Sequence, residues 1–470
     1  MSEFISSISD STIHSLCDEL LKNNSIQPED YKRFDVKKGL RNSDGTGVMA
    51  GLTKICSVEG YYIDDGERVP REGRLFYRGI NMSDIVKNCK QENRFGFEEV
   101  VWLLLFGDLP TKEQLDAFTS VLAQARELPD EFIEDIIMKA PSRDIMNKVA
   151  SSVLGLYTFD ENPDDTSLEN VLRQSIQLIA QIPMLMSYAY QAKRRAFDHK
   201  SMYIHQNKLD YTMAESILGS IRSDRKFSDA EAKLLDTCMI IHADHGGGNN
   251  SAFTTRCITS TGTDTYSAIA ASIGSLKGPK HGGANIRVHR MLEDIKTNVK
   301  NTADEGQIAD YLAKIIKKEA GDGSGLIYGM GHAVYTLSDP RAKLLKQDAA
   351  KYSAEFGYEE DFRILDTIER VTPELFCKYK GIKKKICANV DLYSGLIYSM
   401  LNIPEELFTP LFMASRSAGW CAHRMEEIYS GGKIMRPAYK SVSLPRGFVP
   451  LAERTDNHKV QNEYIPSEER

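Results

Sequence analysis

The strongest constraint on the fold is a succession of apolar segments with helical spacing, bounded by residues that start or stop helices. Residues 97–107 begin with a phenylalanine and two acids, turn apolar and end at a glycine. Thr111 with Gln114, and Ser228 with Glu231, match capping boxes, in which a hydroxyl and an acid or amide three residues later satisfy N–H groups at a helix start. The pattern predicts a mainly α-helical protein.

Further helices and a small sheet are expected elsewhere in the chain. Apolar residues recur at helical spacing in three more segments, residues 171–196 (with Pro183 as an expected kink), 305–319 and 341–354. Residues 51–63 and 72–78 carry β-branched and aromatic residues between glycines and charges, which favours strands. We therefore expect an all-α fold class with minor N-terminal β-structure.

Composition excludes several classes of protein. The chain has 470 residues, 41% of them hydrophobic, which is enough for a sizeable core, and a formal net charge of −7. An acidic balance disfavours a general nucleic-acid binder, and no apolar run is long enough to span a membrane. The N-terminal stretch lacks the basic start of a signal peptide, and the eight cysteines form no C-x-x-C pair. These features favour a cytoplasmic protein with reduced thiols.

Three histidines lie beside glycines, which let a ligand approach the backbone closely. His245 precedes a Gly-Gly-Gly-Asn-Asn-Ser run, His281 lies in Gly-Pro-Lys-His-Gly-Gly-Ala-Asn, and His332 follows Gly-Met-Gly. Singly each suits a structural role, but three together indicate an active site. His242 and His245 form an H-x-x-H pair; a zinc site would need a third ligand, and we interpret His242 as structural.

Three arginines that follow these histidines along the chain suit an anionic substrate. Arg341, Arg416 and Arg436 could each bind a carboxylate through two N–H groups, although a surface position is the simpler interpretation of any one of them. Phe412 shares a helical face with Arg416. Asp391 lies in an apolar stretch, where burial would raise its pKa and make it a usable base; it could also, or instead, be the N-cap of the following helix.

Together these segments resemble the citrate synthase family. The similar motifs occur in the family's order between residues 242 and 436: His-Ala-Asp-His, Gly-Pro-Lys-His-Gly-Gly-Ala-Asn, Gly-Met-Gly-His-Ala-Val-Tyr with Asp-Pro-Arg, Asn-Val-Asp-Leu-Tyr-Ser-Gly, and the stretch from Phe412 to His423. Weaker similarity extends upstream, and only about the first forty residues match nothing in the family. The order of the motifs is far more specific than any one of them.

The resemblance implies an acyltransferase of the tricarboxylic acid cycle that condenses acetyl-CoA with oxaloacetate, without a metal or other cofactor. By position, the catalytic residues would be Asp391 as the base for the methyl group of acetyl-CoA, His281 as the donor to the enolate oxygen, and His332 as the group that polarises the oxaloacetate carbonyl. Four further residues would bind oxaloacetate: His245, Arg341, Arg416 and Arg436. Phe412 would form a wall of the pocket.

The resemblance also implies an architecture. A large helical domain would comprise residues 41–280 and 393–470, a small helical domain residues 281–392, and residues 1–40 an extension. The active site would lie in the cleft between the domains, which would close over oxaloacetate. The family is dimeric, and Arg436 would reach the site of the second subunit.

Recognition of CoA is the least specific part of the resemblance. Gly331, Lys343 and Lys385 are candidates for this contact, as are neighbouring basic residues, Lys346, Lys378, Lys380, Lys383 and Lys384. A solvated face explains these lysines equally well. The sequence departs from frequent family residues at Lys280, Ala333 and Leu392, and Leu392 leaves the shape of the acyl pocket open.

Three other functions remain to be distinguished. A 2-methylcitrate synthase would use propionyl-CoA with the same catalytic residues, and one methylene in an apolar pocket gives only about 1–3 kcal/mol of discrimination. A metal-dependent hydrolase would lose activity after treatment with EDTA. A non-enzymatic helical scaffold would tolerate Asp391→Asn without any loss of function.

Overall fold

The computed structural model describes residues 9–23, 26–42, 44–382, 385–443 and 447–454. The chain divides into two compact units, one of residues 1–49 with 436–470 and the other of residues 50–435. In the first unit the described elements are short helices, α1 (Asp10–Asn23), α2 (Pro28–Arg33), η1 (Lys38–Leu40) and η5 (Leu451–Glu453). No helix in the described part of the chain has the length and apolar character that crossing a membrane requires.

The second unit begins with the small sheet that the sequence predicts. Its strands are antiparallel in the order β1 (Cys56–Asp64), β2 (Glu67–Tyr77) and β3 (Ile80–Asn81). The predicted first strand was placed too early, because residues 51–55 precede β1. The register between β1 and β2 shifts at Gly60, between Glu59 and Tyr61. A bulge of this kind bends a strand, and glycine removes the side chain that would obstruct the bend.

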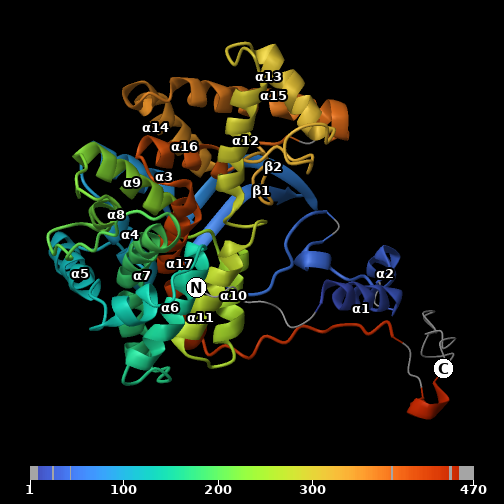
Figure 1. The fold of residues 1–470 in the computed structure, drawn as a ribbon, viewed down its shortest axis with the longest axis horizontal. Coiled ribbons are helices and arrows are strands. Elements are labelled where there is room, and N and C mark those ends of the chain that lie inside the picture. Colours follow the sequence, from blue (N-terminus) through green and yellow to red (C-terminus); the bar gives the residue numbers. More distant parts are fainter. Residues whose placement is uncertain (1–8, 24–25, 43, 383–384, 444–446, 455–470) are drawn as a thin grey trace. The chain divides into compact units, whose positions relative to one another are not determined.

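The rest of the second unit is helical, which confirms the predicted fold class (Figure 1). Its helices are α3 (Met82–Gln91), α4 (Phe97–Phe106), α5 (Lys112–Ala125), α6 (Ile145–Leu156), α7 (Leu168–Phe197), α8 (Met213–Ile221), α9 (Asp229–His242), α10 (Asn250–Thr259), α11 (Thr265–Lys277), α12 (Ala284–Asn298), α13 (Glu305–Ile316), α14 (Pro340–Phe356), α15 (Glu359–Lys380), α16 (Asp391–Met400) and α17 (Phe408–Tyr429), with short turns at η2 (Ile133–Met138), η3 (Tyr157–Phe159) and η4 (Glu405–Leu407).

The helix boundaries follow the local signals in the sequence. Both predicted capping boxes form, at the start of α5 and of α9. The helix α4 ends as predicted at Gly107, which takes the left-handed conformation with φ of 94°. Pro183 lies inside the long helix α7, as expected, although the residues around it stay helical.

The helix α17 is the centre of the large helical assembly. Every residue from Phe408 to Glu427 is buried, including the bulky Trp420. The helix packs against α4, α7, α9, α10 and α11, and Figure 1 shows it enclosed by these helices. A helix that is buried on all sides presents polar residues to protein rather than to water, so each buried charge on α17 needs a compensating group.

A second group of helices packs together within the same unit. The helix α12 contacts α16, α13 contacts α15, and α14 contacts both α15 and α16. Figure 1 shows them beside one another, coloured yellow to red. These helices fall mostly within residues 281–392, and the division into a large and a small domain at those boundaries remains a prediction.

Gly60 offers a test of how the sheet positions the loop that follows Gly331. A Cβ at this position would lie 2.6 Å from the carbonyl oxygen of Val334. Gly60→Ala must therefore displace the loop or bend β1, and we expect a loss of about 1–3 kcal/mol in the free energy of unfolding. Urea denaturation measures the change. Gly51→Ala is the matched control, since a Cβ there meets nothing within 4 Å; equal stability of the two variants would refute the proposed contact.

Candidate active site

His245 and His332 meet although they are far apart in the sequence. Their ring centroids are 5.2 Å apart, and Tyr335 stacks on His332 at 4.7 Å and lies 5.7 Å from His245. His245 follows α9, whereas His332 and Tyr335 belong to the loop before α14. Burial and the positive charge of Arg341 hold the pKa of His245 well below its usual range.

Backbone hydrogen bonds fix the tautomer of His332. The N–H groups of Val334 and Tyr335 both donate to its Nδ1, each at 3.1 Å. An imidazole nitrogen that accepts hydrogen bonds carries the lone pair, so in the neutral ring the proton lies on Nε2. His332 is therefore arranged to donate a hydrogen bond through Nε2.

His281 is held through one ring nitrogen. Its Nε2 lies 3.1 Å from Oδ1 of Asn249 and 3.1 Å from Oγ of Ser251. The indole N–H of Trp420 donates to the same Ser251 hydroxyl at 3.0 Å. The Ser251 hydroxyl donates to Asn249 Oδ1 at 2.9 Å, and an amide oxygen can only accept, so these contacts favour the neutral tautomer of His281 with its proton on Nε2. Burial, with Arg416 and Arg341 nearby, lowers the pKa of His281 to about 4.

Asp391 has the properties of a base in a buried site. Burial raises the pKa of its carboxyl group to about 7, although the charges of Arg341 and Arg416 act in the opposite direction. Its Oδ1 is buried without a hydrogen-bond partner among the described residues. The alternative role as N-cap is wrong, because Asp391 is the first residue of α16 and its own N–H donates to the side chain of Asn389 at 3.0 Å.

Arg416 is a buried cation with unused donors. Its Nε donates to the carbonyl oxygen of His242 at 2.6 Å, but neither of its terminal nitrogens has a partner among the described residues. The guanidinium also lies over the ring of Phe412 at 4.6 Å. Burial lowers the pKa of Arg416 to about 10, so the group is still charged at neutral pH. Unsatisfied buried donors of this kind suit an anionic ligand with several oxygen atoms.

Arg341 differs from Arg416 in having a carboxylate partner. Its Nε and one terminal nitrogen donate to the two oxygens of Asp339, at 3.0 and 2.7 Å. Asp339 is the N-cap of α14, so the ion pair fixes the arginine at the start of that helix. Burial opposes the charge, but Asp339 outweighs it and raises the pKa of Arg341. The remaining nitrogen can bind a ligand without any rotation of the guanidinium.

Several supporting residues were not identified as functional from the sequence. Asn249 and Ser251 hold His281, Asp339 holds Arg341, and Tyr335 stacks on His332. Asn249 is the N-cap of α10, a role that its position between glycines and a helix could have indicated. Asp339 is likewise an N-cap and binds Arg341 only two residues away, and Tyr335 lies close to His332 in the sequence, whereas the contact of Ser251 with His281 spans 30 residues and leaves no local signal.

A buried polar network lies next to His245. Asp244 accepts a hydrogen bond from the N–H of Gly246 at 2.9 Å and contacts Nε2 of His423 at 3.2 Å. Burial opposes its ionisation, but His423 and Arg416 outweigh this and lower the pKa of Asp244. His242 is buried beside Phe412, at 4.4 Å between rings, and its side-chain nitrogens have no partner among the described residues. Its carbonyl group positions Arg416.

The other predicted residues make different contacts or belong to the other unit. Arg436 is exposed and belongs to the first unit. Lys343 is exposed and pairs with Glu72 at 2.5 Å, and Lys385 is exposed. Gly331 has φ of 93° and donates to the carbonyl oxygen of Cys387 at 2.8 Å. The candidates Lys383 and Lys384 lie outside the described residues. No group of His, Cys, Asp and Glu among the described residues could hold a metal ion.

A helical protein with neutral histidines, a carboxyl group of raised pKa and buried arginines in one site has the features of an acid–base enzyme for an anionic substrate. Residues 42–438 match the family described as citrate synthase, C-terminal domain. The chain belongs to the citrate synthase family.

Individual relatives carry two different names. A citrate synthase of Synechocystis is 33% identical over 87% of this chain and 92% of its own length. A 2-methylcitrate synthase of Shewanella oneidensis is 33% identical over 89% of this chain and 100% of its own length. Among solved structures, the ternary complex of citrate synthase from Thermoplasma acidophilum with carboxymethyl coenzyme A and oxaloacetate is similar with a TM-score of 0.72 and 25% identity, over 89% of this chain and 99% of that one.

The raised pKa of Asp391 predicts a cost in stability. A carboxyl group with a raised pKa favours the folded state below its unfolded pKa, and this advantage is lost as the pH rises through about 7. Asp391→Asn should therefore be more stable than the original protein at pH 8, by on the order of 2–4 kcal/mol, and the difference should fall by more than half at pH 5. Denaturant unfolding at both pH values measures this, with Asp108→Asn at an exposed acid as control. A difference independent of pH would contradict the assignment.

Proposed function

We propose that this protein is a citrate synthase, which condenses acetyl-CoA with oxaloacetate and water to give citrate and CoA. The observation that carries the proposal is the position of Asp391, a carboxyl group with a pKa of about 7, under the influence of Arg341 and Arg416. Family membership and the names of several relatives support it. The reaction needs a base for a weak carbon acid and cations for a dianion, and this site offers both.

Asp391 would remove a proton from the methyl group of acetyl-CoA. At neutral pH a carboxyl group with a pKa near 7 is half ionised and is a stronger base than an exposed aspartate. The product is an enol or enolate, whose oxygen must be stabilised as negative charge develops. Asp391 Oδ1, buried without a partner among the described residues, is free to accept the proton.

His281 would donate the hydrogen bond to the enolate oxygen. Its pKa of about 4 keeps the ring neutral, which makes it a donor matched to a weakly acidic enol. The donor nitrogen would be Nδ1, which requires the Ser251 hydroxyl to turn its proton from Asn249 Oδ1 to Nε2 of His281. The indole N–H of Trp420 occupies one acceptor position of Ser251 and leaves the hydroxyl proton available for this bond.

His332 would polarise the carbonyl group of oxaloacetate and protonate it as the carbon–carbon bond forms. The backbone bonds to Nδ1 place its proton on Nε2, where a substrate oxygen can accept it. The stacked ring of Tyr335 limits rotation of the imidazole. Hydrolysis of the citryl-CoA thioester would then release CoA and citrate.

Arg341, Arg416 and His245 would hold the carboxylates of oxaloacetate, with Phe412 as a wall of the pocket. Arg416 supplies buried N–H groups that have no other partner among the described residues, and Arg341 is oriented in advance by Asp339. Such preorganisation lowers the entropy that binding costs. Arg436 would complete the site from the second subunit of a homodimer.

The finer parts of the proposal rest on the resemblance alone. CoA would contact the loop at Gly331 and the basic residues Lys343 and Lys385, and the helices of residues 281–392 would close as a small domain over the substrates. No metal or other cofactor is assigned a role. The proposed location is the cytoplasm, which the sequence features favour.

Release of a free thiol tests the proposed reaction. We expect release of CoA from acetyl-CoA only when oxaloacetate is present, and a loss of at least about a thousandfold in kcat for Asp391→Asn. A thiol reagent follows the reaction, with propionyl-CoA as the competing substrate. Faster turnover of propionyl-CoA would assign the protein as a 2-methylcitrate synthase. Absence of release from a folded protein with either substrate would refute both assignments.

The acid limb of the pH profile tests the base. Because only ionised Asp391 can accept the proton, kcat/KM for acetyl-CoA should fall about tenfold per pH unit below pH 7. Stopped-flow measurement at saturating oxaloacetate gives this profile. The residual activity of Asp391→Asn supplies the control and should lack the limb. A profile that stays flat down to pH 5 would exclude Asp391 as the base.

Complementation between inactive variants tests the role of Arg436. In a dimer of one Asp391→Asn chain and one Arg436→Gln chain, exchange of Arg436 across the interface leaves one site intact. Co-expression with random pairing should therefore restore about a quarter of the original activity. If Arg436 served the site of its own chain, every site would lack one residue and no activity would return.

A further inference from the structure

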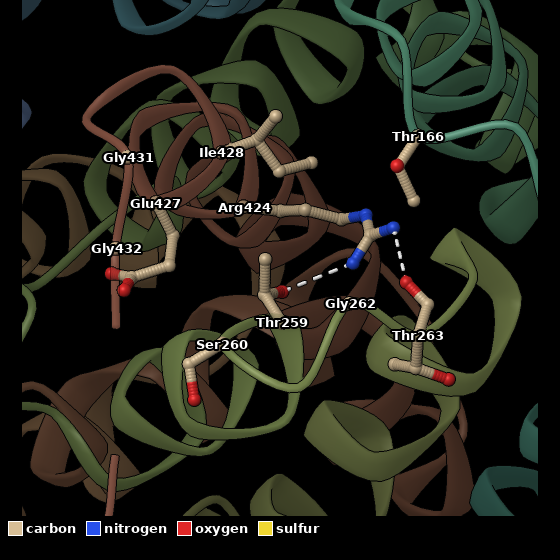
Figure 2. A pocket seen from close by; sticks show the side chains of 10 residues that line it. All are labelled: Thr166, Thr259, Ser260, Gly262, Thr263, Arg424, Glu427, Ile428, Gly431 and Gly432. Atoms are coloured by element: carbon tan, nitrogen blue, oxygen red, sulfur yellow. Dashed lines mark hydrogen bonds between the residues drawn. The ribbon is translucent and has the colours of Figure 1, made fainter. Parts of the chain in front are cut away.

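A polar cavity lies at the C-terminal end of α17, and the proposed reaction does not use it. Its volume is about 170 Å³, which is below the range of about 300–1,000 Å³ typical of sites for drug-sized ligands. It therefore suits a ligand of a few atoms. The lining is rich in hydroxyl groups and glycines: Thr166, Thr259, Ser260, Gly262, Thr263, Arg424, Glu427, Ile428, Gly431 and Gly432 (Figure 2).

Arg424 is the buried cation of this cavity. Its guanidinium donates to three uncharged oxygens, the hydroxyls of Thr265 and Thr259 at 3.1 Å each and the carbonyl group of Thr263 at 2.8 Å. A guanidinium carries more N–H groups than these bonds use. Among the described residues Arg424 forms no ion pair, in contrast to Arg256, which pairs with Glu426 and Glu427. Burial lowers the pKa of Arg424 to about 10, so it is still charged at neutral pH.

The acids near Arg424 are occupied elsewhere. Asp264, which acts on it electrostatically, caps α11 through the N–H of Ser267 at 2.7 Å. Glu427 lines the cavity, but its carboxylate is bound by Arg256 at 3.1 Å. Figure 2 shows the guanidinium pointing toward the threonines and the Glu427 carboxylate lying on the other side, near Gly432. The charge of Arg424 is therefore not neutralised by a direct partner among the described residues.

Hydroxyl groups around the guanidinium can supply further donors. The Thr259 hydroxyl accepts from Arg424, and its own proton is not used in a bond among the described residues. Thr166 is exposed, and its hydroxyl has no described partner. A buried cation with adjacent hydroxyl donors is the arrangement that binds an oxyanion, since each oxygen can accept a charge-assisted or neutral hydrogen bond.

We propose that the cavity between α10, α17 and the loop before α7 binds a small oxyanion of the size of inorganic phosphate. Arg424 supplies the charge, and the hydroxyls of Thr166 and Thr259 supply directional hydrogen bonds. The site is separate from the residues that the proposed reaction uses, and the proposal does not depend on that reaction.

Calorimetric titration with inorganic phosphate at constant ionic strength tests the site. The titrations use the full chain, the variants Arg424→Gln and Thr166→Val, and Thr297→Val as control. We expect saturable binding that Arg424→Gln abolishes and that Thr166→Val weakens about tenfold. Thr297→Val changes an exposed threonine of α12 outside the cavity and should bind like the original protein.

A rise in melting temperature with phosphate gives the second readout, because a ligand that binds only the folded state stabilises it. Phosphate also stabilises proteins through solvent exclusion, but that effect would be equal in all variants. Equal phosphate responses of the original protein and Thr166→Val, in affinity and in melting temperature, would refute the proposal even if Arg424→Gln failed to fold. Absence of saturable binding to the original protein would refute it as well.

Discussion

The site depends on the burial of Arg416, a residue of the buried helix α17. A guanidinium without water around it needs acceptors, and here the carbonyl group of His242 satisfies only Nε. The other nitrogens are left to bind an anion, and the positive charge acts on the groups around it. It helps to lower the pKa of His281 and opposes the burial that raises the pKa of Asp391. Burial is the larger cause of the neutral histidines and of the raised pKa of Asp391, and Arg416 acts on both together with Arg341.

The two arginines of the site are held in different ways, and the difference affects how each would bind the substrate in the proposed reaction. Arg341 is bound by Asp339 through two hydrogen bonds, which fix its direction and offset its charge. Among the described residues Arg416 has no such partner, although the charge of Asp244 partly offsets the effect of burial on its pKa. A ligand therefore gains most from Arg416, where it replaces missing hydrogen bonds, and gains orientation from Arg341. The unsatisfied N–H groups of Arg416 lower the stability of the folded protein, as is usual where a binding site is preorganised.

Much of the fold was predictable because its signals are local. The capping boxes before α5 and α9 and the glycine after α4 each involve residues within one turn, and all three formed as expected. The start of β1 was misplaced because β-branched residues favour a strand without specifying where pairing begins. Asp391 shows the limit of local interpretation: an acid before a helical segment looks like an N-cap, but Asp391 is the first residue inside α16. Its N–H donates to the Asn389 side chain, and its Oδ1 has no hydrogen-bond partner among the described residues.

The sequence by itself determined the helical class, the family and the candidate residues, because periodicity, helix caps and the order of motifs depend only on residues that are near one another or ordered along the chain. Only the tertiary structure decided how these residues act, because a pKa and a tautomer depend on neighbours that are distant in sequence. Backbone groups of Val334 and Tyr335 set the proton of His332, Ser251 and Asn249 hold His281, and Trp420 reaches Ser251 from a helix almost 170 residues later. No sequence pattern identified Arg424 as a functional residue. Tertiary packing buries its guanidinium beside a cavity, where it has no carboxylate partner among the described residues.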